Sequence, residues 1–344
     1  MKNMYVSITG IGTRLGSKQE SASELARAFK SNDKDRTRYL KKNGFERLVV
    51  SKFADSEEFY SLSAEAIHEA IARSGINLKD IKFLYSGLAC PVESRFLPGF
   101  ARDISERVGL EGICSVDMGR GCVASMQALQ VASDRLERMR CDGEYGAGII
   151  LGGENSSLVI DPNDQATSII FSSGVAAAVV SNYGPMKHIV KKVACRNLSR
   201  KDLVDAGHSS NEMPGLIDSM VVKNPLLTGG REFFKMDGDK VYEFAAKHAC
   251  KISLGLLGLS KVPEGAYIIP HQASPKALDS FIELNGLNAE DVYTEGARTI
   301  GNTSSATTLF GLADVQEKME GREIILMPFG SGPSVGAVYL ASLK

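Results

Sequence analysis

Two periodic patterns of apolar and polar positions alternate along this chain of 344 residues. Short runs rich in β-branched and aromatic residues have the pattern of buried strands, and longer segments with apolar residues three or four positions apart have the pattern of helices. In the first half, strand patterns at residues 4–12, 81–87, 114–119, 146–153 and 175–181 alternate with helical patterns at 59–75, 100–108 and 124–139. This alternation predicts an α/β fold in which sheets are buried between helices.

The second half of the chain repeats this rhythm. It has helical patterns at residues 239–258, 274–286 and 304–319 and strand patterns at 266–272, 322–330 and 334–343. Residues 115–132 and 291–315 share a strand–turn–helix layout, which we interpret as a sign of internal duplication. We expect two closely packed halves, residues 1–185 and 186–344. The polar segment 194–235 has little periodicity and is expected to be an excursion that covers a site.

Composition narrows the class of protein. Hydrophobic residues make up 43% and charged residues 24% of the chain, ordinary values for a protein with a buried core. Lys plus Arg number 40 against 41 for Asp plus Glu, so the strong positive field needed for non-specific nucleic-acid or membrane binding is missing. The chain has no apolar run near the roughly 20 residues of a membrane helix, and its N-terminus does not have the pattern of a signal peptide. We therefore expect a cytoplasmic protein that binds neither nucleic acid nor membranes.

The six cysteines have no CxxC pair and no dense spacing, which disfavours a disulfide scaffold and a metal site. Cys122 differs from the others because it follows a predicted strand and a glycine-containing turn and opens a predicted helix. The helix dipole and free backbone N–H groups at such a position favour a thiolate, which predicts a lowered pKa. The alternative is that Cys122 is a small buried side chain without chemistry, as most cytosolic cysteines are.

Two polar residues lie at comparable points of the second half. His271 follows Pro270 at the end of a predicted strand, where open α/β sheets bind ligands. Asn302 lies in a Gly-Asn turn before a predicted helix, where its simplest role is an N-cap. The glycine-punctuated segment 327–337 is either a hairpin turn or the source of a backbone donor for a developing oxyanion.

Together these motifs resemble the β-ketoacyl-acyl-carrier-protein synthase III family, condensing enzymes of the thiolase superfamily. The resemblance covers essentially the whole chain, with the motifs in the family's order. The motifs are VDMGRGCVASMQAL around Cys122, DPND at 161–164, IIFSSGVAAAVV at 169–180, FKMDGDKVYEFA at 234–245, IIPHQASPKAL at 268–278, GNTSSATT at 301–308 and MPFGSGPSVGA at 327–337. The resemblance implies a thiolase-like, five-layered αβαβα fold built from two duplicated halves, and a homodimer.

The resemblance also implies a mechanism that needs no metal and no bound cofactor. Cys122 would take an acyl group from a thioester, which releases the carrier thiol. His271 and Asn302 would then hydrogen-bond the carbonyl of a malonyl thioester on acyl carrier protein and stabilise the enolate formed as carbon dioxide leaves. The enolate would attack the acyl group on Cys122, while the backbone N–H groups of Cys122 and Ser331 hold the oxyanion.

The chain departs from the family's pattern at the coenzyme A clamp, where members commonly hold the adenine between a Trp and an Arg. This chain has no Trp; Arg38 stands at the Trp position and Gln165 at the Arg position. We therefore expect the first acyl donor on acyl carrier protein, or on coenzyme A that is held differently.

Further positions match substrate-binding residues of the family. Lys276 matches a basic residue that docks the carrier, and Ser274 lies in the same HQASPK motif. Gly238 and Asp239 match a turn in the channel for the pantetheine arm. Phe96 belongs to the stretch that, in the family, reaches across the dimer interface to cap the acyl pocket, and it would set chain length.

Three functions remain open on these grounds. The leading one is decarboxylative condensation, in fatty-acid synthesis or in a specialised polyketide-type pathway. The second is transfer of the Cys122 acyl group to an alcohol or amine without decarboxylation, which a missing Asn302 would favour. The third is a non-catalytic partner subunit, which would lack the Cys or the His. Because Cys122, His271 and Asn302 are all present, the sequence favours condensation.

Overall fold

The computed structural model describes residues 2–30, 32–88, 99–119, 121–165, 167–199, 233–234, 236–319, 321–331 and 333–342. Phe96 and most of the polar segment predicted at 194–235 lie outside the described residues. The strands are β1 (Lys2–Leu15), β2 (Lys18–Ser21), β3 (Val49–Lys52), β4 (Ile81–Leu88), β5 (Cys114–Gly119), β6 (Ala147–Glu154), β7 (Gly174–Tyr183), β8 (His188–Asn197), β9 (Tyr267–Pro270), β10 (Glu323–Met327), β11 (Phe329–Gly330) and β12 (Ser334–Ser342). The helices are α1 (Ala22–Ala26), α2 (Asp33–Asn43), α3 (Ser56–Ser74), α4 (Phe100–Arg107), α5 (Ala124–Cys141), α6 (Ser156–Val159), α10 (Gly238–Lys247), α11 (Ala249–Leu257), α12 (Pro275–Leu284), α13 (Glu295–Thr299) and α14 (Thr307–Val315).

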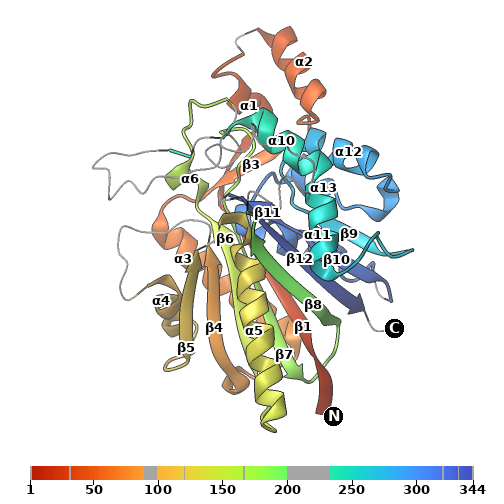
Figure 1. Ribbon diagram of the computed structural model, residues 1–344. Helices are drawn as coiled ribbons and strands as arrows, with labels where there is room; N and C mark the ends of the chain where they lie inside the picture. The colour runs from red at the N-terminus through yellow and green to blue at the C-terminus, as the bar shows by residue number, and fades with distance from the viewer. Residues whose placement is uncertain are drawn as a thin grey trace.

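Strands from both halves form one large mixed sheet with the order β5-β4-β6-β7-β1-β8-β12-β10-β9, and β11 pairs with β12 (Figure 1). We count only the strands of this sheet and leave β11 aside. The first strand of each half is then central and is followed outward by the half's last strand, the strand before it, and its second strand, which is β4 or β9; β5 lies beyond β4 at the edge. The antiparallel pairs Ser7–Ile189 and Ile8–His188 join β1 to β8 at the centre. This matching order supports the predicted duplication. The boundary at residues 185 and 186, between β7 and β8, stays a prediction.

Alternate residues of the strands pack into different apolar cores, which arranges the molecule in layers. In β6, Ile150 faces a central core that contains α5 and α14, whereas Ile149 faces an outer core with α3 and α4. In β10, Ile324 faces the same central core and Ile325 an outer core with α11. Because both faces of the strands are buried, these strands are almost continuously apolar. The parts of the sheet contributed by the two halves form separate layers on either side of α5 and α14. The layers therefore run helix, sheet, helix, sheet, helix, with α5 and α14 in the shared middle.

Two predicted elements differ from the structure. The helical pattern at 239–258 forms two helices, α10 and α11, because the chain bends at His248, where φ is −117° and ψ is −35°. The polar segment predicted from residue 194 begins as the end of β8, which continues to Asn197 and pairs with β12. Ala194 and Cys195 are half-buried and Arg196 and Asn197 are exposed, so this end of the strand has no apolar period that would distinguish it from irregular chain.

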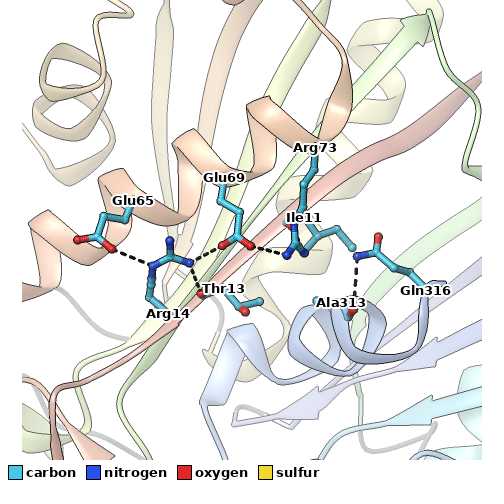
Figure 2. Close-up of polar contacts among 8 residues, drawn as sticks. All are labelled: Ile11, Thr13, Arg14, Glu65, Glu69, Arg73, Ala313 and Gln316. Carbon is cyan, nitrogen blue, oxygen red and sulfur yellow. Dashed lines mark hydrogen bonds and ion pairs between the residues drawn. The ribbon is translucent and has the colours of Figure 1, made fainter. Parts of the chain in front are cut away.

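Glycine in β1 allows α3 to pack directly on the strand. A Cβ atom at Gly12 would lie 2.1 Å from the carbonyl oxygen of Ala66 in α3, far inside a normal contact distance. Charged groups beside this contact tie the same two elements together, as Figure 2 shows. Arg14 of β1 forms ion pairs with Glu65, at 2.9 Å, and with Glu69 of α3.

Arg73 extends this network by one helical turn. Its guanidinium pairs with Glu69 at 2.7 Å and donates to the carbonyl of Ile11 at 3.3 Å (Figure 2). Glu69 is therefore shared between two arginines, one on the strand and one on its own helix. The network fixes α3 along β1 in the register that places Ala66 over Gly12.

Substituting Gly12 by Ala tests this close approach. We expect Gly12→Ala to lower the free energy of unfolding by about 2–3 kcal/mol, because the added methyl group forces α3 away from β1. The matched control is Gly255→Ala in α11, where an added Cβ meets no atom within 4 Å. It should leave stability unchanged or raise it by up to about 1 kcal/mol, since Ala favours helix. Urea unfolding followed by circular dichroism measures both; equal effects would contradict the packing.

Candidate functional site

A cavity of about 960 Å³ opens between elements of both halves. It brings together all the described site residues that the sequence predicts. They are Cys122, Gly238, Asp239, His271, Ser274, Lys276, Asn302 and Ser331. Phe96, predicted to cap the acyl pocket, lies outside the described residues.

Cys122 lies in a 3₁₀ turn, Gly121–Val123, between β5 and α5. Strand β11 packs tightly against it, because a Cβ atom at Gly330, the last residue of the strand, would lie 2.8 Å from the backbone nitrogen of Cys122. Ser331, the next residue, contacts Gly121 on the other side of the turn and also lines the cavity. The backbone N–H groups of Cys122 and Ser331 therefore belong to adjoining segments at one place in the cavity wall.

The predicted low pKa of the Cys122 thiol is wrong. Burial raises the pKa to about 11; the hydrogen bond with Ser304 lowers it, and the charge of Glu154 raises it further. A helix terminus stabilises a nearby anion by only about 0.3–1 kcal/mol, less than the cost of removing a thiolate from water. Cys122 also precedes the α-helix rather than starting it, since α5 begins at Ala124. The resting thiol is protonated at neutral pH.

His271 directly follows β9, and its backbone N–H donates to the carbonyl of Met327 at 3.0 Å. Its ring packs edge-on against Phe329, with ring centres 4.9 Å apart. The side chain is buried, and Nδ1 finds no hydrogen-bond partner among the described residues. Burial lowers the pKa of His271 to about 3, so the imidazole is neutral throughout the physiological range.

The orientation of the Asn302 amide follows from its hydrogen bonds. Its Oδ1 accepts from the backbone N–H of Ser304 at 2.8 Å and from the hydroxyl of Thr307 at 3.3 Å. An N–H group can donate only to the oxygen, so the amide cannot be flipped. The expected N-cap role is wrong, because Thr303 is the N-cap of the 3₁₀ turn Ser304–Ala306; the Asn302 side chain instead closes a local turn onto Ser304. It uses only the oxygen, and the NH₂ group stays available in the wall of the cavity.

The outer part of the cavity contains the residues predicted to bind the carrier. Gly238 and Asp239 start α10, and Ser274 caps α12 by accepting from the N–H of Ala277. The ammonium group of Lys276 lies 5.0 Å from the ring centre of Tyr242. The polar and charged groups of this region come from the starts of two helices in the second half.

At the position of the family's adenine clamp, the structure differs from a simple replacement of Trp by Arg. Arg38 is exposed on α2, and its neighbour Tyr39 lines the cavity instead. The Tyr39 hydroxyl hydrogen-bonds with Gln165, which also lines the cavity. The two side chains that could hold an adenine are thus engaged with each other.

Sequence reasoning missed two residues of the site. Glu154, at the end of β6, is buried in the cavity wall, and burial raises its pKa to about 8, opposed by hydrogen bonds from the Asn155 backbone and the Ser304 side chain. The Ser304 hydroxyl lies 3.3 Å from the Cys122 sulfur. A Glu after a strand and a Ser in a small-residue turn carry no distinctive spacing. These two residues are identified as part of the site only by their contact with each other, which joins the two halves of the chain.

Groupings of three or more His, Cys, Asp or Glu side chains suited to a metal ion are absent from the described parts of the chain. In those same parts, none of the helices has the length and apolar character to cross a membrane.

Comparison with known proteins relates both halves to one family. Residues 116–197 match the profile described as 3-Oxoacyl-[acyl-carrier-protein (ACP)] synthase III, and residues 261–342 match the profile of that family's C-terminal region. The β-ketoacyl-[acyl-carrier-protein] synthase III of Neisseria gonorrhoeae (strain NCCP11945) is 26% identical over 343 residues, covering 98% of this chain and 99% of the relative.

Solved structures show the same fold. The 3-oxoacyl-(acyl carrier protein) synthase III of Pseudomonas aeruginosa PAO1 superposes with a TM-score of 0.78 at 19% identity and covers 99% of both chains. The priming β-ketosynthase of the R1128 polyketide biosynthetic pathway superposes with a TM-score of 0.76 at 19% identity, over 100% of this chain and 98% of that one. With its thiolase-like fold and profile matches in both halves, the chain is similar over almost its whole length to the β-ketoacyl-acyl-carrier-protein synthase III family of condensing enzymes.

Proposed function

We propose that Cys122 receives an acyl group and that His271 and Asn302 decarboxylate a malonyl thioester on acyl carrier protein to extend it. The observation that carries this proposal is the meeting of a thiol, a neutral imidazole and a free amide NH₂ in one cavity. A thiol is a competent nucleophile for thioester exchange, and two neutral N–H donors suit a thioester enolate.

In the first half-reaction, the Cys122 sulfur attacks the carbonyl carbon of an acyl thioester. The carbonyl oxygen then becomes an oxyanion, which needs donors at its new position. The backbone N–H groups of Cys122 and Ser331 lie on adjoining segments and supply them. Collapse of the oxyanion expels the carrier thiolate and leaves the acyl group on Cys122.

In the second half-reaction, the malonyl thioester loses carbon dioxide and becomes an enolate. Neutral His271 and the Asn302 NH₂ group donate to the enolate oxygen. The enolate carbon then attacks the acyl group on Cys122, and the thiol is regenerated. Because both donors are neutral, the enolate keeps its negative charge and its nucleophilicity.

The volume and lining of the cavity suit a substrate delivered on a pantetheine arm. Apolar side chains, including Phe171, Phe234 and Met236, line it together with Cys122. We propose that acyl carrier protein docks near Lys276, and that Gly238, Asp239 and Ser274 flank its arm. A basic residue at the mouth suits an acidic carrier surface.

Two further proposals concern the protein's state in the cell. We propose that it acts in the cytoplasm. Cys114, Cys122, Cys141, Cys195 and Cys250 form no disulfide, which is typical of a reducing compartment.

We also propose a homodimer formed through β5. This strand is at the edge of the sheet, and its Val116 is 38% exposed. The outer backbone N–H and C=O groups of an edge strand can pair with a strand of a second copy.

The Asn302→Ala substitution separates condensation from simple acyl transfer. Loss of the amide donor should slow carbon dioxide release from labelled malonyl-carrier by about 10²–10³-fold, the usual effect of removing one oxyanion donor. Acyl loading of Cys122, read by intact-protein mass spectrometry, should suffer far less because its oxyanion uses backbone donors. Cys122→Ala is the control and should show no acyl mass shift.

Two outcomes would contradict the proposal. An acyl mass shift on the Cys122→Ala protein would place the nucleophile elsewhere. Wild-type protein that loads acyl groups yet releases no carbon dioxide from any malonyl donor would replace condensation by acyl transfer to an alcohol or amine.

The preference for one acyl donor over another tests whether the hydrogen bond between Tyr39 and Gln165 prevents this pair from holding an adenine. With one acyl chain offered on acyl carrier protein and on coenzyme A, kcat/KM for loading should be higher for the carrier protein, since the adenine finds no clamp. A clear preference for coenzyme A would refute this expectation.

The dimer proposal is tested by a charge on the exposed edge. Val116→Lys should shift the protein towards half its wild-type mass in light scattering after gel filtration, because a desolvated ammonium opposes strand pairing. Leu284→Lys on α12 is the matched control, since Leu284 is 56% exposed and distant in the sheet order from β5. The proposed interface would be refuted if the wild-type protein has the mass of a monomer, or if the two variants have equal masses in light scattering.

A further inference from the structure

Two side chains that the mechanism above leaves unused, Ser304 and Glu154, form a polar chain with Cys122 in the cavity wall. The Cys122 sulfur lies 3.3 Å from the Ser304 hydroxyl, which also hydrogen-bonds with the Glu154 carboxyl. Cys122 comes from the turn before α5, Glu154 from the end of β6, and Ser304 from the turn before α14. The Ser304 hydroxyl is both donor and acceptor, so it can pass a proton between its two neighbours.

The backbone of Ser304 is held in a conformation that Ser rarely adopts. Its φ is +55°, and among the described residues it is the one non-glycine residue with positive φ. The Asn302 side chain accepts from its N–H at 2.8 Å. The next residue, Ser305, accepts from the N–H of Gly153 at 2.9 Å and donates to the carbonyl of Gly87 at 2.7 Å. Strain of this kind persists only where surrounding contacts over-determine it, and it gathers at functional sites.

The remaining groups of the site do not offer the thiol proton a better acceptor. His271 has a pKa of about 3 because it is buried, and so it is a weak base. Glu154 has a pKa of about 8 because it is buried, which is close to working pH. The negative charge of Glu154 raises the pKa of Cys122. The other charged residues that line the cavity are Asp164, Asp239 and Lys276.

We propose that Ser304 carries the proton of the Cys122 thiol to the Glu154 carboxylate while the acyl group is loaded. Glu154 is then the general base of the first half-reaction, and Ser304 is the relay that positions and transmits the proton. This inference rests on the proposed function, since it concerns the loading of Cys122.

The step balances as a thioester exchange. The bond between the Cys122 sulfur and the acyl carbon forms while the sulfur–hydrogen bond breaks; Ser304 takes that proton and gives its own to Glu154. The bond between the acyl carbon and the carrier sulfur then breaks. The departing thiolate takes the proton back from Glu154, so the products are acyl-Cys122 and free carrier thiol, and no oxidant or metal takes part.

The proposal is tested by comparing the two half-reactions in Glu154→Gln and Ser304→Ala. Single-turnover loading from an acyl thioester should fall about 100-fold in Glu154→Gln and at least about tenfold in Ser304→Ala, the range expected for loss of acid–base catalysis. The loss should exceed any loss of carbon dioxide release from malonyl-carrier by about tenfold or more, because decarboxylation does not move the thiol proton. Wild-type loading should rise with pH around 8 as Glu154 ionises, and Glu154→Gln should lose this rise.

Two controls separate chemistry from folding. Ser304→Gly accepts the positive φ without strain but lacks the hydroxyl, so it should be as slow in loading as Ser304→Ala. Glu154→Asp keeps a carboxyl group and should recover part of the loading rate and the rise with pH. If Glu154→Gln does not fold, the two Ser304 variants decide the matter alone.

Loading in Ser304→Ala and Ser304→Gly within twofold of wild type across pH 6–9 would overturn the proposal. So would an equal loss of loading and decarboxylation in those variants, which would show a structural role for the hydroxyl. Failure of the proposed function looks different, because there the wild-type protein itself would load no acyl group or release no carbon dioxide.

Discussion

The apolar packing of α5 and α14 between the two halves is the interaction on which the fold and the site both depend. Helices α5 and α14 pack against each other's sheet as well as their own, and their buried side chains form one central core. The turns that precede these helices carry Cys122 on one side and Asn302 with Ser304 on the other. The packing that buries the core therefore also sets the distance between the nucleophile and its partners, although they lie about half the chain apart in sequence.

Removal of water shifts the pKa values of Cys122, Glu154 and His271, in directions set by the charge of each ionised form. Burial raises the pKa of Cys122 to about 11 and of Glu154 to about 8, and it lowers the pKa of His271 to about 3. The resting site thus holds an uncharged thiol and an uncharged imidazole. Such a site places no charge of the thiol or the imidazole beside a neutral acyl thioester. The donors must then stabilise the negative charge that passes from the malonyl carboxylate to the enolate.

The sequence predicted the order of elements well where apolar periodicity was strong, as in β6, β7 and α5, and it placed Cys122, His271 and Asn302 through motifs at element ends. It failed where geometry decides. The polar strand at the end of β8 and the bend at His248 leave no clear period, and the small unit formed by α1, α2, β2 and β3 was not predicted at all. The φ of Ser304 and the cost of burying Cys122 depend on neighbours from the other half of the chain, which no local pattern contains.

The small unit of α1, α2, β2 and β3 has an apolar cluster of its own, separate from the central core, with Leu40, Leu48 and Val50 among its members. It also supplies Tyr39 and Asn43 to the cavity. Since Tyr39 and Asn43 pack outside the central core, substitutions at these two positions can reshape the cavity wall while the packing of α5 and α14 is kept. The shape of the cavity and the stability of the central core can therefore vary separately.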